Sequence, residues 1–297
     1  MVLAQLSSSE DHLGPDFLQP QITAGFSSAA TRNFQDIDGT FDVNSATLGA
    51  AIPVVRSLEG TIDNPTAYFA LVRGQFSSVN EDVSFLPSPH MIYKSRIGVT
   101  GGIATTNHHM YLLTIAEGFS EDRHTVGNAR IRTTGSLLGK YQLEDSFAFI
   151  YGLSYSYTFN RGLVLPLLGT RCSLGSNLNL HVILPFSLDL DYEEAQELHF
   201  GFVVRANGDQ IHIEDNSYLG PQAFPVFLKL AQLQAGFSVS FDLSDRIVLR
   251  GEAGILRNRS FAIGTLDMNL ISSNIANAGY SSLVLKYVFG TFESWGD

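Results

Sequence analysis

Residues that could carry out chemistry are few in this sequence, and their spacing does not suit it. His108 and His109 are adjacent, and neighbouring side chains on a strand point to opposite faces, so the two imidazoles cannot serve one metal or catalytic site. Asp36 and Asp38 stand just before Gly39, but the remaining ligand spacing and the terminal Glu of an EF-hand are missing. We therefore expect a loop or strand-end position for the histidines, an Asp/Gly turn, no metal and no cofactor.

The candidate nucleophiles lack the surroundings of a hydrolase site. Ser154 lies in Gly152-Leu153-Ser154-Tyr155, which has no closing glycine for a nucleophile elbow, and its small polar neighbours predict a place on the lumen side. Cys172 is the single cysteine, which excludes an intrachain disulfide and a cysteine-based metal cluster. We expect no catalytic residue and no enzyme.

The composition argues against nucleic acid as a partner and points towards a membrane. The net charge is −11, and the 18 Lys and Arg residues are scattered along the 297 residues, whereas phosphate-binding surfaces need clustered cations. Charged residues make up 16% of the chain, below the roughly 25% of soluble proteins. No run approaches the roughly 18 apolar residues of a membrane-spanning helix. A membrane protein without such a run must be a closed β-barrel, because only closure satisfies the backbone of strands in lipid.

The strongest evidence for strands is an alternation over residues 147–159. One set of positions carries only large apolar or aromatic side chains, whereas the positions between them are small or polar apart from Ile150. Since successive side chains on a strand point to opposite faces, this segment separates two different environments. The alternation recurs over residues 177–189, 198–205, 227–242 and 247–255. These runs exceed the roughly 5–6 residues usual for soluble strands and suit the roughly 9–11 needed to cross a membrane.

Turn residues predict antiparallel hairpins between these strands. Residues 207–209 read Asn-Gly-Asp, and Asn-Gly supplies the positive φ angles of a type I′ hairpin. Residues 242–245 join two clear strands in the same way. We predict an all-β fold, a single antiparallel transmembrane β-barrel of about 12 strands within a range of about 10–14, since bacterial barrels use even counts.

The last predicted strand carries Leu283, Leu285, Tyr287 and Phe289 at alternate positions. It resembles the aromatic-ended closing strand of bacterial outer-membrane β-barrel proteins, which the barrel-assembly machinery reads during insertion. This chain departs from that pattern because Gly290–Asp297 follows. The resemblance implies a Gram-negative outer membrane as the location, with its lipid and the assembly machinery as partners.

A second resemblance rests on Pro166, Gly169 and Pro185. A Pro-x-x-Gly hairpin before a strand that ends near a second proline is similar to an uncharacterised family of outer-membrane barrels of unknown function, so it implies no activity. We interpret the chain as a signal-peptide remnant and mobile N-terminal segment (1–19), an outer-membrane β-barrel (20–292) and a tail (293–297).

The two faces of the strands predict two sets of residues. A charged side chain facing lipid costs about 2–4 kcal/mol at the midplane, so the ionisable residues of the polar face are predicted to line the lumen. These are Arg73, Glu197, His199, Arg205, Arg246, Arg250, Glu252 and Lys286. The opposite face is predicted to form a lipid-facing belt that includes Phe147, Phe149, Tyr151, Tyr155, Tyr157, Phe159 and Phe289.

The polar face leaves the function open between alternatives. In a porin-like pathway for small solutes, charged residues would line water and bias passage. In a closed structural barrel, the same residues would neutralise one another across strands. A width of about 12 strands suits both. We place the pathway first and the closed barrel second, followed by an outer-membrane barrel enzyme and a soluble β-sandwich binder.

Overall fold

The computed structural model of this chain consists of β-strands and their connections. Among the residues it describes, no helix is long and apolar enough to cross a membrane. The predicted N-terminal segment up to residue 18 and the predicted tail lie outside the described residues, as do His108 and Phe159. The described ranges are 19–61, 64–84, 90–105, 109–122, 130–144, 146–158, 161–195, 197–213, 226–264 and 269–289.

The described residues form fifteen strand segments, each paired antiparallel with its neighbours. They are β1 (Gln21–Asn33), β2 (Thr40–Thr61), β3 (Asn64–Val83), β4 (His90–Thr105), β5 (His109–Asp122), β6 (Arg130–Glu144), β7 (Phe147–Thr158), β8 (Arg161–Ser173), β9 (Leu178–Leu184), β10 (Ser187–Ala195), β11 (Leu198–Ile213), β12 (Val226–Ser244), β13 (Ile247–Gly264), β14 (Asn269–Ile275) and β15 (Ala278–Val288).

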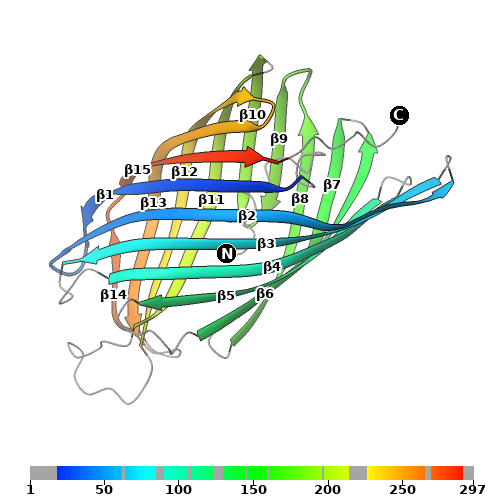
Figure 1. Cartoon of the computed structure of the whole chain (residues 1–297). Coiled ribbons are helices and arrows are strands. Elements are labelled where there is room, and N and C mark those ends of the chain that lie inside the picture. Colours follow the sequence, from blue (N-terminus) through cyan, green and yellow to red (C-terminus); the bar gives the residue numbers. More distant parts are fainter. Residues whose placement is uncertain are drawn as a thin grey trace.

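The segments close into one barrel (Figure 1). β1 to β12 pair in sequence order, β12 also pairs with β13, and β1 pairs with β15. In Figure 1 the blue β1 and the red β15 accordingly lie side by side. β14 pairs with Arg259–Gly264 of β13 and β15 with Ile247–Leu256 of the same strand. β14 and β15 are therefore one interrupted strand, and the barrel has 14 strands.

The all-β antiparallel barrel is confirmed, but the preferred count of about 12 strands is too low. Strands of the N-terminal third are hard to recognise because their two faces differ little. On β1, Ile22 and Phe26 are exposed, but Ala24 is exposed between them and Ser28 follows. Small side chains on the outer face lower the contrast on which an alternation depends.

The predicted hairpin turn at residues 207–209 is wrong. These residues lie within β11, where Gly208 pairs with Ala231 of β12. β11 and β12 pair without a register shift, so a continuous ladder of hydrogen bonds outweighs the local preference of Asn-Gly for a turn. The predicted connection at 242–245 agrees with the end of β12 and the start of β13.

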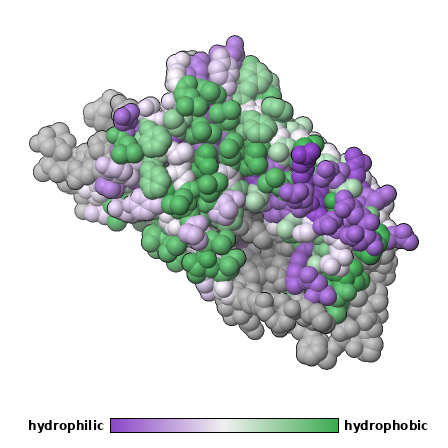
Figure 2. Space-filling model, turned by 180° about the vertical axis from the view of Figure 1, so that it is seen from behind, coloured by the Kyte–Doolittle hydropathy of each residue, from purple (hydrophilic) through white to green (hydrophobic). Residues whose placement is uncertain are grey.

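The two faces of the wall differ as the alternation predicts. On β7, Phe149, Leu153 and Tyr155 are exposed, whereas Ile150 and Ser154 between them are buried. Since the strands close on themselves, the exposed face is the outside of the barrel. Figure 2 shows hydrophobic side chains gathered over a broad area of that outside, with hydrophilic side chains concentrated towards one end. An apolar outer surface of this kind suits lipid rather than water.

The two ends of the barrel carry connections of different length. At one end, called here the turn end, two-residue gaps separate β2 from β3, β6 from β7, β10 from β11 and β12 from β13. β1 begins and β15 ends there, since Gln21 pairs with Val288. At the other end, the loop end, residues 34–39, 84–89, 123–129 and 214–225 separate successive strands, although two-residue gaps separate β7 from β8 and β9 from β10 there. Outer-membrane barrels have short turns on the periplasmic side and longer loops outside.

A bulge in β13 changes which residues face the interior. Ala231 of β12 pairs with Ser260 and Leu233 with Arg257, so one β12 residue lies opposite two β13 residues. One of these two, Asn258, has a positive φ of 48°, a conformation that asparagine tolerates better than most residues. The extra residue shifts the alternation by one, so β13 presents Glu252 to the interior on one side of the bulge and Phe261 on the other, and both are buried.

Candidate functional site

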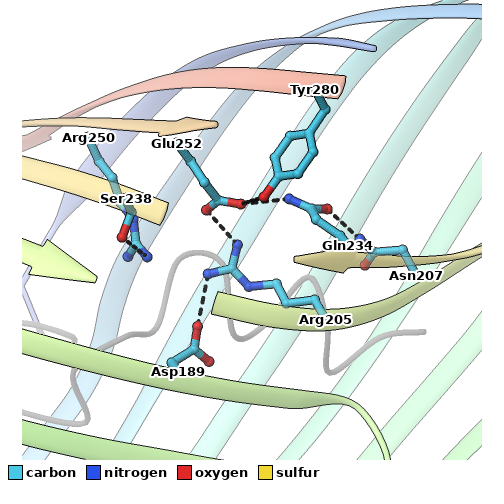
Figure 3. A network of polar contacts seen from close by, with 8 residues as sticks. All are labelled: Asp189, Arg205, Asn207, Gln234, Ser238, Arg250, Glu252 and Tyr280. Carbon is cyan, nitrogen blue, oxygen red and sulfur yellow. Dashed lines mark hydrogen bonds and ion pairs between the residues drawn. The ribbon is translucent and has the colours of Figure 1, made fainter. Parts of the chain in front are cut away.

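The centre of the interior holds a buried network of charged side chains around Arg205 of β11 (Figure 3). One guanidinium nitrogen donates to Asp189 Oδ1 of β10 at 3.1 Å, and another donates to Glu252 Oε2 of β13 at 3.0 Å. Arg205 and Asp189 expose only 5% and 1% of their surface, and Glu252 is also buried. One cation therefore joins two carboxylates from different strands where water does not screen them.

The second oxygen of Glu252 completes the network. Glu252 Oε1 accepts a hydrogen bond from the Tyr280 hydroxyl of β15 at 2.6 Å and from Gln234 Nε2 of β12 at 2.7 Å. Gln234 in turn accepts from Asn207 Nδ2 at 2.7 Å. A Cβ at Gly236 would lie 2.2 Å from the Tyr280 hydroxyl, so only glycine leaves room for this phenol. The network thus links five strands, β10 to β13 and β15.

The barrel is narrowed where β5 approaches β11. β5 and β11 lie six strands apart in the sheet, yet their Cα atoms approach within 8 Å. A round barrel of 14 strands would hold nearly opposite walls roughly 20 Å or more apart. The inward side chains of both strands are buried, namely Leu112, Thr114 and Ala116 of β5 and Val203 and Arg205 of β11. The interior is therefore narrow where these two strands approach each other.

An apolar cluster fills the interior nearer the loop end. Its centre is aromatic: the ring of Phe34 lies 5.0 Å from that of Phe261 and 6.2 Å from that of Phe41, centroid to centroid. The Arg259 guanidinium lies over the Phe41 ring, 5.4 Å from its centroid. The other buried members are Val79, Val83, Ile92, Leu228, Ile263 and Ile275. A hydrophobic layer here resists the entry of water and ions.

The structure separates the residues predicted to line the lumen. Arg205 and Glu252 belong to the network, and Arg250 donates to the Ser238 hydroxyl beside it at 3.3 Å. His199 Nε2 lies 3.8 Å from Asp242 Oδ2 near the turn end.

The remaining four predicted residues lie apart from the network. Arg73 of β3 and Lys286 of β15 are half-buried within their strands, and Lys286 lies near the turn end. Glu197 and Arg246 are exposed and lie in the connections β10–β11 and β12–β13.

Sequence reasoning missed most of the network's polar partners. Asp189 and Gln234 both stand on the polar side of alternating segments, so that pattern carried a signal for them. Tyr280 and Asn207 carried none, because the first is a large aromatic residue and the second was interpreted as a turn. Their roles depend on pairings between strands distant in sequence.

The residues predicted to face lipid are described in part. Phe149, Tyr155 and Phe289 are exposed by 39%, 40% and 41%, as expected for a surface that meets an apolar solvent. Phe147 and Tyr151 are half-buried, and the Tyr151 ring stacks on that of Phe149 with centroids 6.0 Å apart. The side chain of Tyr157 lies outside the described part of the chain, as does Phe159.

The other candidate residues have structural surroundings. The ring of His109 stacks on that of Tyr141, with centroids 4.6 Å apart. Asp36 Oδ2 accepts hydrogen bonds from the Ser273 hydroxyl and the Asn274 backbone N–H, each at 3.2 Å, which ties the Asp/Gly turn to β14. Ser154 is buried and Cys172 is half-buried. Within the described ranges, no group of three or more His, Cys, Asp or Glu residues could hold a metal ion.

Comparisons with known proteins agree with the fold. No protein-family model matches the sequence, and a search of curated proteins found no match. An outer-membrane channel from Pseudomonas putida F1 is 8% identical with a TM-score of 0.48, over 93% of this chain and 99% of that one. The translocator domain of the autotransporter NalP from Neisseria meningitidis is 11% identical with a TM-score of 0.38, over 97% and 94%. LpxR from Salmonella typhimurium is 8% identical with a TM-score of 0.39, over 91% and 100%.

These similar structures are bacterial outer-membrane β-barrels, the class that the sequence was predicted to resemble. At such identities the likeness concerns the architecture alone, and the barrel itself rests on its own strand pairing. The finer resemblance based on Pro166, Gly169 and Pro185 stays a prediction.

Proposed function

We propose that this chain is an integral outer-membrane β-barrel whose interior is closed at rest, so that it is not a constitutively open porin. The short connections of the turn end face the periplasm, and the longer ones of the loop end face outwards, as in other bacterial barrels. The closed barrel, second among the alternatives from the sequence, thereby moves ahead of the open pathway.

The observation that carries this proposal is the buried network around Arg205. Water-filled pores keep their lumen charges hydrated, whereas Arg205 and Asp189 are almost fully withdrawn from solvent. Charges are buried in this way only where partners compensate them. The approach of β5 to β11 and the aromatic cluster around Phe261 support the same conclusion at two levels of the barrel.

Planar-bilayer conductance of the folded, full-length protein tests the proposal. We expect no steady open steps from the wild type, with insertion established separately by heat-modifiable migration on SDS gels. Arg205→Ala should give intermittent steps, because it removes the cation that joins β11 to β10 and β13. Arg246→Ala, which removes an exposed cation in the β12–β13 turn, should stay silent. Stable open steps from the wild type would show that the lumen is open and the proposal wrong.

A pathway for small anionic solutes is the second candidate function. It is favoured by the inward cations at positions away from the network, such as Arg96, Lys140 and Arg171. This alternative requires that the β5–β11 approach opens. Open steps whose reversal potential in a salt gradient shows anion selectivity would favour this pathway over the closed barrel.

A further inference from the structure

Two inward cations, Lys140 of β6 and Arg171 of β8, share one patch of the interior near the turn end. Lys140 pairs with Ile150 of β7, which pairs with Gly169 of β8, two residues before Arg171. Strands lie about 4.8 Å apart, so two long side chains on either side of β7 reach the same space. Both side chains are half-buried and point inward, so their charges face the same space.

No carboxylate lies opposite either cation on the adjacent strands. Lys140 faces Met110 and Ile150 across the strands, and Arg171 faces Ala148 and His181. Neither head group forms an ion pair or a side-chain hydrogen bond with any residue in the described ranges.

Two carboxylates of β10 also face the interior near Arg171: Asp189 lies in its lateral row, and Asp191 lies two residues further along, opposite Asn179. Asp189 is paired with His181, the neighbour of Arg171, and its carboxylate accepts the hydrogen bond from Arg205. Arg205 is therefore the hydrogen-bonded partner of Asp189, and within the described ranges neither Asp189 nor Asp191 forms an ion pair with Lys140 or Arg171.

We propose that Lys140 and Arg171 form a binding site for a small divalent anion of the phosphate or sulfate type, reached from the turn end of the barrel. Two like charges in a partly buried space repel each other strongly because the local dielectric is low. An anion with two charges compensates both, and an arginine guanidinium matches the oxygens of phosphate or sulfate with paired N–H donors. Leu138 and Leu167, on the same two strands, belong to an apolar cluster with Ile183 and Phe186, and apolar surroundings strengthen the attraction between charges.

Calorimetric titration of the folded full-length protein with sodium sulfate, in detergent and chloride buffer, tests this site. We expect one sulfate per chain, phosphate to compete, and additional chloride to compete only weakly. Lys140→Gln and Arg171→Gln should each weaken sulfate binding at least tenfold. Lys286→Gln, which removes an inward cation on β15 away from the patch, should change it less than twofold. No sulfate binding, or equal loss in all three variants, would overturn the proposal, since the second result marks general charge attraction.

Thermal melting gives an independent test, because a purely structural role of Lys140 would not produce the result expected here. Without divalent anions, Lys140→Gln should melt at a higher temperature than the wild type, because it relieves the repulsion. In sulfate the order should reverse, since only the wild type gains stability from binding. A variant that melts lower in both buffers would contradict the site. None of these results depends on whether the lumen conducts, so the site and the closed-barrel proposal can fail separately.

Discussion

At the scale of single residues, Arg205 decides how the interior is held together. A buried ion pair gains little over a well-packed apolar substitute, because taking charges out of water is costly. Removing one partner is a different matter, since the remaining charge loses its compensation. Arg205 forms ion pairs with two carboxylates at once, so its loss leaves both Asp189 and Glu252 without their buried cation.

Arg205→Ala is therefore expected to lower the free energy of unfolding by about 3–5 kcal/mol, the range found when one partner of a buried pair is removed. Urea unfolding in lipid vesicles, followed by circular dichroism, measures this change. Arg246→Ala is the matched control, because Arg246 is exposed in a turn and should change stability by less than about 0.5 kcal/mol. Equal effects of the two substitutions would contradict the burial of the network.

At the scale of elements, the free-energy cost of a charged side chain on the outer face depends on its position along the strand. β12 shows it well, because Phe237 and Phe241 both point outwards and are exposed by 71% and 45%. Phe241 lies close to the end of β12 at Ser244, whereas Phe237 lies further into the barrel wall. A long charged side chain near a strand end reaches the headgroup region, and one at the middle does not.

Phe237→Arg should accordingly cost about 2–4 kcal/mol of stability and reduce insertion into vesicles. Phe241→Arg should cost only about 0–1 kcal/mol, as found near membrane interfaces. The fraction of folded protein after refolding into vesicles, read from heat-modifiable migration, compares the two directly. If both variants insert equally well, the outer face of β12 does not meet hydrocarbon.

The elements also show how far sequence reasoning reaches here. Alternation on β7 predicts its inner and outer residues, because the period of two is a local property of a strand. It fails past Asn258 of β13, where the bulge shifts the alternation by one residue. The strand count and the inclusion of residues 207–209 in β11 depend on partners distant in sequence. The network around Glu252 depends on them even more, because it joins β10 and β11 to β12, β13 and β15.

At the scale of the whole molecule, the pairing of β1 with β15 closes the barrel. Ser27 lies opposite Ser282 in this pairing, and paired Cα atoms of antiparallel strands are about 4.5–5.5 Å apart. That separation lies within the range of about 4.4–6.8 Å that a disulfide bridges.

The double variant Ser27→Cys/Ser282→Cys, made with Cys172→Ala to remove the native thiol, should therefore form a disulfide on mild oxidation of the folded protein. Oxidised and reduced samples are compared by migration on denaturing gels, where a cross-linked chain stays more compact. Ser27→Cys/Ser154→Cys is the control, because β7 lies across the barrel from β1. Failure of the first pair to cross-link would show that β1 and β15 do not close the barrel.

The same pairing has a consequence for the order of folding. Hairpins such as β6–β7 join neighbours in the chain and can form as soon as both strands are available. β1 and β15 come together only by closing a loop that contains nearly every other strand, which carries the largest entropic cost of any pairing in the molecule. Until then β1 presents an unpaired edge, open to the wrong partner. The final, rate-limiting event of assembly should therefore be the pairing of the first and last strands. A catalyst of barrel assembly would act at this step by covering the unpaired edge of β1 until β15 pairs with it.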